Sequence, residues 1–233
     1  MDIAICIDYD NLLPIHKNQG ILDIVTKTLH KISENISENC KCEVRLYGGW
    51  YEGENLTPLS QDISVNIQED FPSFIKVMNE NFIFTIKTSA EMAFSLLNEP
   101  SHFLFNTYRR KGKPNNIRVE KKENIQCESS SCFIDIAKKF IRTGKCPNQG
   151  CQNDNLIYRH EQKLVDTMLT CDLIHLSDKG CEIIILISAD DDFLPPIRML
   201  LAKGTKTIRI HPKYNERNNC ISIAGNKLIE MEL

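Results

Sequence analysis

The sequence predicts an α/β protein with a doubly wound, mainly parallel sheet in a Rossmann-type three-layer arrangement. Strand-like apolar runs alternate with helical patterns at both ends of the chain, which is the order expected of such a sheet. Between these ends, residues 109–155 differ in charge and cysteine content, so we predict that they form a small insertion within one domain of residues 1–233.

The composition is that of a globular protein. The 233 residues are 42% hydrophobic and 25% charged, enough to bury a sizeable core. No apolar run approaches the roughly 20 residues that a membrane span needs. The amino terminus, MDIAICID, is acidic and strand-like where a signal peptide is basic and then helical. We therefore expect a cytoplasmic protein without a membrane partner, whose cysteines are thiols or metal ligands rather than disulfides.

The first part of the chain predicts a βαβ unit. Ile3–Ile7 is expected to be a strand that ends at a turn of polar residues, and apolar side chains at helical spacing between Ile21 and Ile32 predict a helix. Cys42–Tyr47 predicts the next strand, which a right-handed crossover makes parallel to the first. Further elements are expected at 81–88 (strand), 90–97 (short helix) and 102–108 (strand).

The later part of the chain contains a strand that is apolar on both faces. Ile183–Ile187 has the pattern of a central parallel strand with helices above and below. Helical patterns lie on either side of it, at 161–176 and 194–203, and another strand is expected at 207–210. The central strand stops at Ser188 and three consecutive aspartates, where α/β folds place their ligands.

Aspartates stand at three places, two of which lie at the carboxyl ends of strands and would share one edge of a parallel sheet. Asp8 follows the first strand, Asp166 lies near a helix start, and Asp190 and Asp192 follow the central strand. Clustered carboxylates repel one another unless a cation neutralises them, and hard oxygen ligands suit Mg²⁺ or Mn²⁺. Such a site can hydrolyse phosphodiesters by activating a water. The alternate spacing assigns Asp190 and Asp192 to the site and turns Asp191 elsewhere.

Simpler roles exist for each acid taken alone. A carboxylate at a helix start is commonly a partner of the helix dipole, and an aspartate after a strand commonly caps a helix. Asp172 lies six residues after Asp166, about 120° around the helix, so both cannot point at one site without distortion, and we prefer Asp166. Whether Asp10 or Asp172 joins the site stays open.

The insertion is strongly basic. Between Tyr108 and Lys145, eleven lysines and arginines face four aspartates and glutamates, a net charge of +7, which leaves −10 for the rest of a chain of net charge −3. This asymmetry suits a polyanion such as RNA, although a solvated loop surface has the same charge pattern. The residues expected to bind the substrate are Arg109, Arg110, Lys111 and Lys113.

Four cysteines in the insertion have matching spacings. Four residues separate Cys127 from Cys132 and Cys146 from Cys151, and thirteen lie between the two pairs. Paired cysteines at both ends of a short excursion predict a tetrahedral, structural Zn²⁺ site, with free thiols as the alternative. Apolar residues at helical spacing between the pairs predict a small helix over the metal.

Three motifs resemble the NYN domains, a family of PIN-like nucleases. IDYDNL resembles their D-x-x-N-L opening, KLVDTMLTCDL their K-x-V-D helix, and SADDDF their S-x-D-x-D-F motif. The resemblance covers residues 1–60 and 155–212 and implies metal-dependent cleavage of RNA. It implies that the metal-binding and catalytic acids are Asp8, Asp166, Asp190 and Asp192, with Asn11 and Ser188 as supporting polar groups. The cysteine-containing insertion departs from the compact pattern of the family.

Two other functions remain as alternatives. Asp8 and Asp10 also match the Asp-x-Asp with which haloacid-dehalogenase-like phosphatases begin, where the first is the nucleophile and the second the acid. That family expects Thr or Val two residues further on, whereas this chain has Leu12. The second alternative is an RNA-binding module that has the fold but does not cleave. The sequence leaves the oligomeric state open.

Overall fold

The structure is a computed structural model that describes residues 1–80, 82–112, 117–121, 123–126, 128–129, 132–146, 156–213 and 221–233. The chain divides into two compact units. The first consists of Met1–Thr107 and Gln162–Leu233, and the second of Tyr108–Glu161. The second unit contains the predicted insertion together with the residues that lead into and out of it.

The first unit is built on a seven-stranded sheet with the order β13-β10-β9-β1-β2-β6-β5. Its strands are β1 (Asp2–Asp8), β2 (Cys40–Tyr47), β5 (Ser73–Asn79), β6 (Phe82–Met92), β9 (Ile183–Ile187), β10 (Lys206–His211) and β13 (Ile229–Glu232). Neighbouring strands are parallel except for β5 and β6, which are antiparallel. The mainly parallel α/β sheet predicted from the sequence is confirmed.

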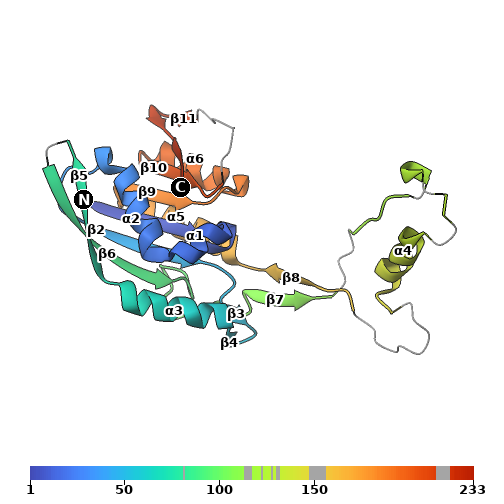
Figure 1. The fold of residues 1–233 in the computed structure, drawn as a ribbon. Helices are drawn as coiled ribbons and strands as arrows, with labels where there is room; N and C mark the ends of the chain where they lie inside the picture. The colour runs from blue at the N-terminus through green and yellow to red at the C-terminus, as the bar shows by residue number, and fades with distance from the viewer. Residues whose placement is uncertain are drawn as a thin grey trace. The chain divides into compact units, whose positions relative to one another are not determined.

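Helices cover both faces of this sheet (Figure 1). On one face α2 (Ile21–Lys31) and α3 (Pro58–Asp70) bury their apolar residues against the sheet, with α1 (Pro14–Gln19) beside α2. On the other face α5 (Val165–Asp178) and α6 (Leu194–Ala202) form a second core. None of the described helices combines the length and the apolar composition that crossing a bilayer needs.

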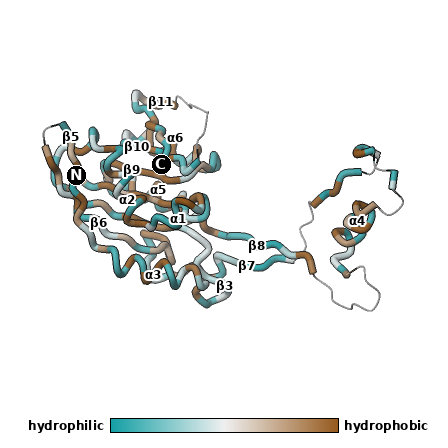
Figure 2. The backbone as a smooth tube through the Cα atoms, in the orientation of Figure 1, coloured by the Kyte–Doolittle hydropathy of each residue, from teal (hydrophilic) through white to brown (hydrophobic). Residues whose placement is uncertain are grey.

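Local sequence explains where several elements begin. Thr57 accepts a hydrogen bond from the Ser60 amide at the start of α3, and Pro58 occupies the first helical position. The predicted helix after β9 is α6, which also has proline in its first turn. Every residue of Ile183–Ile187 is buried, and the tube of β9 is hydrophobic along its length (Figure 2), as expected of a strand packed on both faces.

The order of the strands reverses between β1 and β9. From β1 the chain continues to β2 and β6 on one side, whereas from β9 it continues to β10 and β13 on the other. Ile7 pairs with Ile187 in parallel register, so Asp8 and Ser188 leave the sheet side by side. The carboxyl ends of β1 and β9 therefore border the crevice in which open α/β sheets bind ligands.

Two of the predicted elements are wrong. Residues 90–97 do not form a helix, because β6 continues to Met92, which pairs with Leu46 of β2. Residues 102–107 do not form a strand. Their alternating aromatic residues instead pack with other rings: Phe103 lies 6.2 Å from Phe94, and Phe105 lies 4.9 Å from Tyr51. The alternation in the sequence therefore reflects contacts between aromatic rings and not strand pairing.

Smaller elements complete the two units. The first unit contains the two-stranded sheets β3 (Tyr51–Glu52) with β4 (Asn55–Leu56) and β11 (Ser222–Ile223) with β12 (Asn226–Lys227), and the 3-10 helices η1 (Tyr9–Asn11), η2 (Ser33–Asn35) and η4 (Asp191–Phe193). In the second unit β7 (Tyr108–Lys111) and β8 (Arg159–Gln162) pair as a ribbon (Figure 1). The same unit contains η3 (Glu123–Ile125) and α4 (Phe133–Thr143), the helix predicted between the cysteine pairs.

Candidate active site

Asp8 is a buried carboxylate at the end of β1. Its side chain is 6% exposed, and its Oδ2 accepts a hydrogen bond of 2.9 Å from the Ser188 hydroxyl. Burial raises the pKa of Asp8 to about 6, and the negative charges of Asp166 and Asp10 also raise it, whereas the Ser188 hydrogen bond lowers it. A buried carboxylate with a raised pKa at the carboxyl edge of a parallel sheet is a candidate functional group.

Hydrogen bonds join the ends of β1 and β9 around Asp8. The Asn11 side chain, which follows β1, accepts from the amide of Ala189, which follows β9, at 2.9 Å. The Ser188 hydroxyl accepts from the Asp190 amide at 3.1 Å, and the Asp190 carboxylate caps η4 by accepting from the Asp192 amide at 2.9 Å. Asn11 and Ser188 therefore fix the backbone that carries the acids.

Helix α5 contributes Asp166 from its first turn. Partial burial raises the pKa of Asp166, and the negative charges of Asp190, Asp192 and Asp10 raise it further, although its side chain remains exposed. The residue before the helix, Leu164, has a left-handed backbone with φ of 68°, which is strained for a residue with a side chain. The structure thus brings the predicted acids of all three motifs into one electrostatic neighbourhood.

Asp10 joins this neighbourhood and was not assigned to the nuclease site from the sequence. It lies in η1, and its Oδ2 accepts from the Gly49 amide at 3.2 Å. It adds to the negative potential at both Asp8 and Asp166. The signal that could have found it is the Gly48-Gly49 turn after β2, because β2 lies next to β1 and ends at the same edge.

The other two aspartates in question lie elsewhere. Asp191 accepts hydrogen bonds from Arg209 of β10 at 3.2 and 3.3 Å, so its carboxylate already has a cationic partner. Asp172 is fully buried, where its Oδ2 lies 3.1 Å from the Nε of Arg45 and accepts from the Tyr47 hydroxyl at 2.9 Å. The choice of Asp166 over Asp172 agrees with this geometry.

The described carboxylates do not converge on a single metal position. Among the described residues no three histidine, cysteine or acidic side chains stand close enough together to hold a metal ion. The raised pKa values of Asp8 and Asp166 nevertheless reflect mutual repulsion as well as burial. A divalent cation would relieve that repulsion, and an all-oxygen donor set suits Mg²⁺ or Mn²⁺, so the residues present fit the predicted ion.

The basic residues of the insertion are partly neutralised. Glu161 pairs with Arg109 and Arg159, each at 2.8 Å, and with Lys111 at 3.5 Å. Arg110 instead lies over the ring of Tyr158, 3.5 Å from its centroid. Lys113 lies outside the described residues. The four predicted substrate-binding cations are therefore not equivalent.

The cysteine prediction is only partly covered, because Cys127 and Cys151 lie outside the described residues. Cys132 is the N-cap residue of α4, where its side chain makes no capping hydrogen bond, and Cys146 follows the end of the helix. The zinc site stays a prediction, because two of its four ligands lie outside the described residues.

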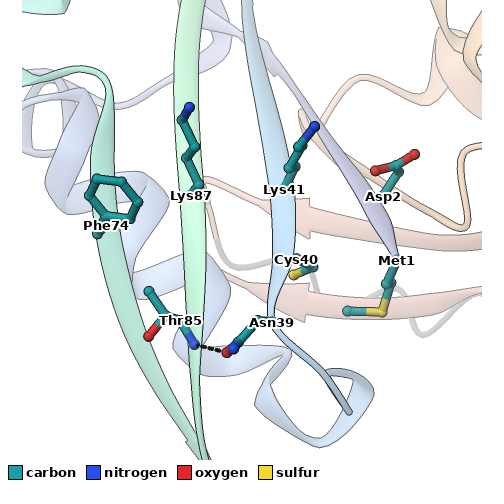
Figure 3. A pocket seen from close by; sticks show the side chains of 8 residues that line it. All are labelled: Met1, Asp2, Asn39, Cys40, Lys41, Phe74, Thr85 and Lys87. Atoms are coloured by element: carbon teal, nitrogen blue, oxygen red, sulfur yellow. Dashed lines mark hydrogen bonds between the residues drawn. The ribbon is translucent and has the colours of Figure 1, made fainter.

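A cleft of about 430 Å³ lies at the amino ends of β1 and β2, whereas Asp8 stands at the carboxyl end of β1 (Figure 3). Met1, Asp2 and Cys40 line it at the amino ends of β1 and β2, with Phe74 and Lys87 from β5 and β6. The Asn39 side chain accepts from the Thr85 amide at 2.7 Å along its wall. Since the acids stand at the carboxyl ends of β1 and β9, this cleft is separate from the candidate site.

Comparisons of the chain with protein-family models, with curated proteins and with solved structures find no match.

Proposed function

We propose that this protein is a metal-dependent endoribonuclease that hydrolyses phosphodiester bonds of RNA in the cytoplasm. The observation that carries the proposal is the gathering of Asp8, Asp166 and the Asp190–Asp192 segment at the point where the strand order reverses. Ligands of open α/β sheets bind at such a point. The pKa values of Asp8 and Asp166 are raised in part by neighbouring carboxylates, and such a group of acids fits a cation and, through it, a phosphate.

The resemblance to NYN domains agrees with this arrangement. The motif acids come from β1, from the first turn of α5 and from the loop after β9, which are far apart in the chain. The PIN-like assignment of the fold rests on those motifs and on the strand order.

Each residue has a definite role in the proposed reaction. Asp8, Asp166, Asp190 and Asp192 would hold Mg²⁺ or Mn²⁺, and Asp10 would add negative potential beside them. The bound ion supplies charge neutralisation at the phosphate and a water of lowered pKa. Ser188 favours the charged form of Asp8 by donating to it, and Asn11 keeps the two strand ends together.

The experiment is a cleavage assay on single-stranded RNA with Mn²⁺, with Mg²⁺ and with EDTA. Asp8→Asn and Asp190→Asn should each lower the rate at least about a hundredfold, because a misplaced ion forfeits several kcal/mol of transition-state stabilisation. The matched control is Asp178→Asn, because Asp178 is an exposed carboxylate of α5 that pairs with Lys203 at the surface. The control should retain activity within about tenfold of the wild type.

Other outcomes separate the alternatives. Full activity in both site variants, or activity undiminished by EDTA, would refute the nuclease proposal. RNA binding without cleavage under any metal condition would favour a non-cleaving module. Release of phosphate from a phosphomonoester that depends on Asp8 and Asp10 would favour the phosphatase alternative.

Structural zinc in the insertion is a separate proposal with its own test. Metal analysis of the purified chain should give about one zinc per chain if the four cysteines share an ion. A Cys127→Ser, Cys132→Ser variant that keeps its metal would refute the site.

A further inference from the structure

The two faces of the β7–β8 ribbon differ in chemistry. Side chains alternate between the faces of a strand. One face carries the ion pairs of Glu161 with Arg109, Lys111 and Arg159. We call this the ion-paired face, because the Glu161 carboxylate pairs with all three of these cations.

The opposite face carries a row of flat groups, which we call the aromatic face: Arg110, Tyr158, His160 and Tyr108. The Arg110 guanidinium lies 3.5 Å from the centroid of the Tyr158 ring. The rings of Tyr158 and His160 are 5.4 Å apart at 37°, and those of His160 and Tyr108 are 4.9 Å apart at 76°. The Tyr108 hydroxyl and His160 Nδ1 share a hydrogen bond. These contacts form a continuous row from both strands.

Three of the four groups in the row are exposed. Tyr158 is 47% exposed even though Arg110 lies over its ring. His160 and Arg110 are also exposed, and Tyr108 is partly buried. The exposed surface of Tyr158 and His160 is available to a planar ligand.

The charge around the row indicates which ligand. The unit Tyr108–Glu161 contains twelve lysines and arginines against six aspartates and glutamates, a net charge of +6. A polyanion with flat, apolar groups complements both features. Single-stranded nucleic acid presents its bases for stacking, whereas a duplex hides their faces.

We propose that the aromatic face of the β7–β8 ribbon binds single-stranded RNA by stacking with its bases, while neighbouring cations hold the phosphates. The choice of RNA as the strand rests on the proposed function. The stacking itself does not, because it needs no metal and no cleavage. Among the predicted substrate-binding cations, Arg110 then contacts bases, and Arg109 and Lys111 contribute through charge alone.

The test uses the full chain with Asp190→Asn, in EDTA, so that binding is measured without cleavage. The probe is a fluorescein-labelled, unstructured RNA of about 20 nucleotides, followed by anisotropy over a series of salt concentrations. Tyr158→Ala should weaken binding about tenfold. The slope of log Kd against log salt should not change, because no charge is removed.

Two control variants distinguish stacking from charge and from misfolding. Tyr158→Phe keeps the ring and should bind like the parent. Arg109→Gln, on the ion-paired face, should lower the salt slope and weaken single-stranded and duplex RNA alike. If Tyr158→Phe loses affinity as Tyr158→Ala does, or if Tyr158→Ala weakens a duplex of the same sequence equally, stacking is refuted.

The outcome is independent of the nuclease assay. A wild type that does not cleave but binds RNA through Tyr158 would refute the proposed activity and support the aromatic face. If the wild type cleaves RNA and the Tyr158→Ala, His160→Ala double variant has an unchanged Kd, the proposed activity is supported and the aromatic face is refuted as a binding surface.

Discussion

Asp8→Asn should stabilise the protein at neutral and alkaline pH, because the native carboxylate is buried. Burial is the largest cause that raises the pKa of Asp8 from 3.8 to about 6. At about 1.36 kcal/mol per pKa unit, this rise corresponds to about 3 kcal/mol. The folded state binds the Asp8 proton more tightly than the unfolded state. The stability that this tighter proton binding contributes is therefore fully present below about pH 4 and is lost as the pH rises through about 6.

The assay is urea unfolding between pH 4 and 8 in EDTA, followed by the fluorescence of Trp50, the single and fully buried tryptophan. At pH 8 the Asp8→Asn variant should exceed the wild type by up to about 3 kcal/mol, and the difference should shrink toward pH 4. Asp2→Asn removes an exposed carboxylate from the start of the same strand. It should stay within about 0.5 kcal/mol of the wild type. A difference at Asp8 that does not grow with pH would refute the reasoning.

Manganese should narrow the difference in stability between the wild type and Asp8→Asn at pH 8. An ion that binds only the folded form stabilises it by about 2.7 kcal/mol at one hundred times its dissociation constant. The wild type should gain this stability at pH 8, whereas Asp8→Asn should gain less because it lacks the charged ligand. If Mn²⁺ stabilises both proteins equally, the carboxylate of Asp8 does not contribute to metal binding, even though its pKa is raised.

Three further substitutions test the frame of the site. Ser188→Ala removes the hydrogen bond that lowers the pKa of Asp8, so the pH-dependent loss of stability should move upward by about one pH unit in the same unfolding series. Gly48→Ala should cost about 1–3 kcal/mol in urea unfolding, because a Cβ there would lie 2.7 Å from the buried tryptophan ring and 3.0 Å from the Asp10 carboxylate. Asp172→Ala should cost about 3–5 kcal/mol, because it leaves a buried arginine without its fully buried partner.

Each structural substitution has a matched control. Gly112 has open space around its Cα and an ordinary backbone, so Gly112→Ala should change stability by less than about 0.5 kcal/mol. Asp178 pairs with Lys203 at the surface of the same helix as Asp172, so Asp178→Ala should cost less than about 1 kcal/mol. If the control variants lose as much stability as Gly48→Ala and Asp172→Ala, then crowding at Gly48 and burial at Asp172 are not the causes of the loss.

The sequence predicts well those parts of the fold whose residue pattern is compatible with only one position in the structure. A run such as Ile183–Ile187 can be buried on both sides only in the middle of a sheet, and it is completely buried there. Acids directly after such strands must leave at the carboxyl edge, which is why Asp8 and Asp190 could be paired from the sequence. The adjacency of the two strands needed the motif resemblance or the structure itself.

Features that depend on a distant partner could not be predicted in this way. Asp10 is placed by an amide of the Gly48-Gly49 turn, and Arg109 is neutralised by Glu161 from the far end of the insertion. In both cases the local sequence reads only as polar or basic. The contact that decides the role of each residue comes from a segment tens of residues away in the chain.

Two arginine–aspartate pairs explain how like charges can be held together at this edge. Arg209, fully buried, binds Asp191 in the segment that also carries Asp190 and Asp192. Arg45, 8% exposed, pairs with Asp172 on the helix that carries Asp166. The two segments that carry Asp166 and Asp190–Asp192 are thus each anchored through a neighbouring carboxylate that an arginine neutralises. Breaking either anchor should let the acidic cluster spread without removing any of its acids, so it should weaken metal affinity even where every proposed ligand remains.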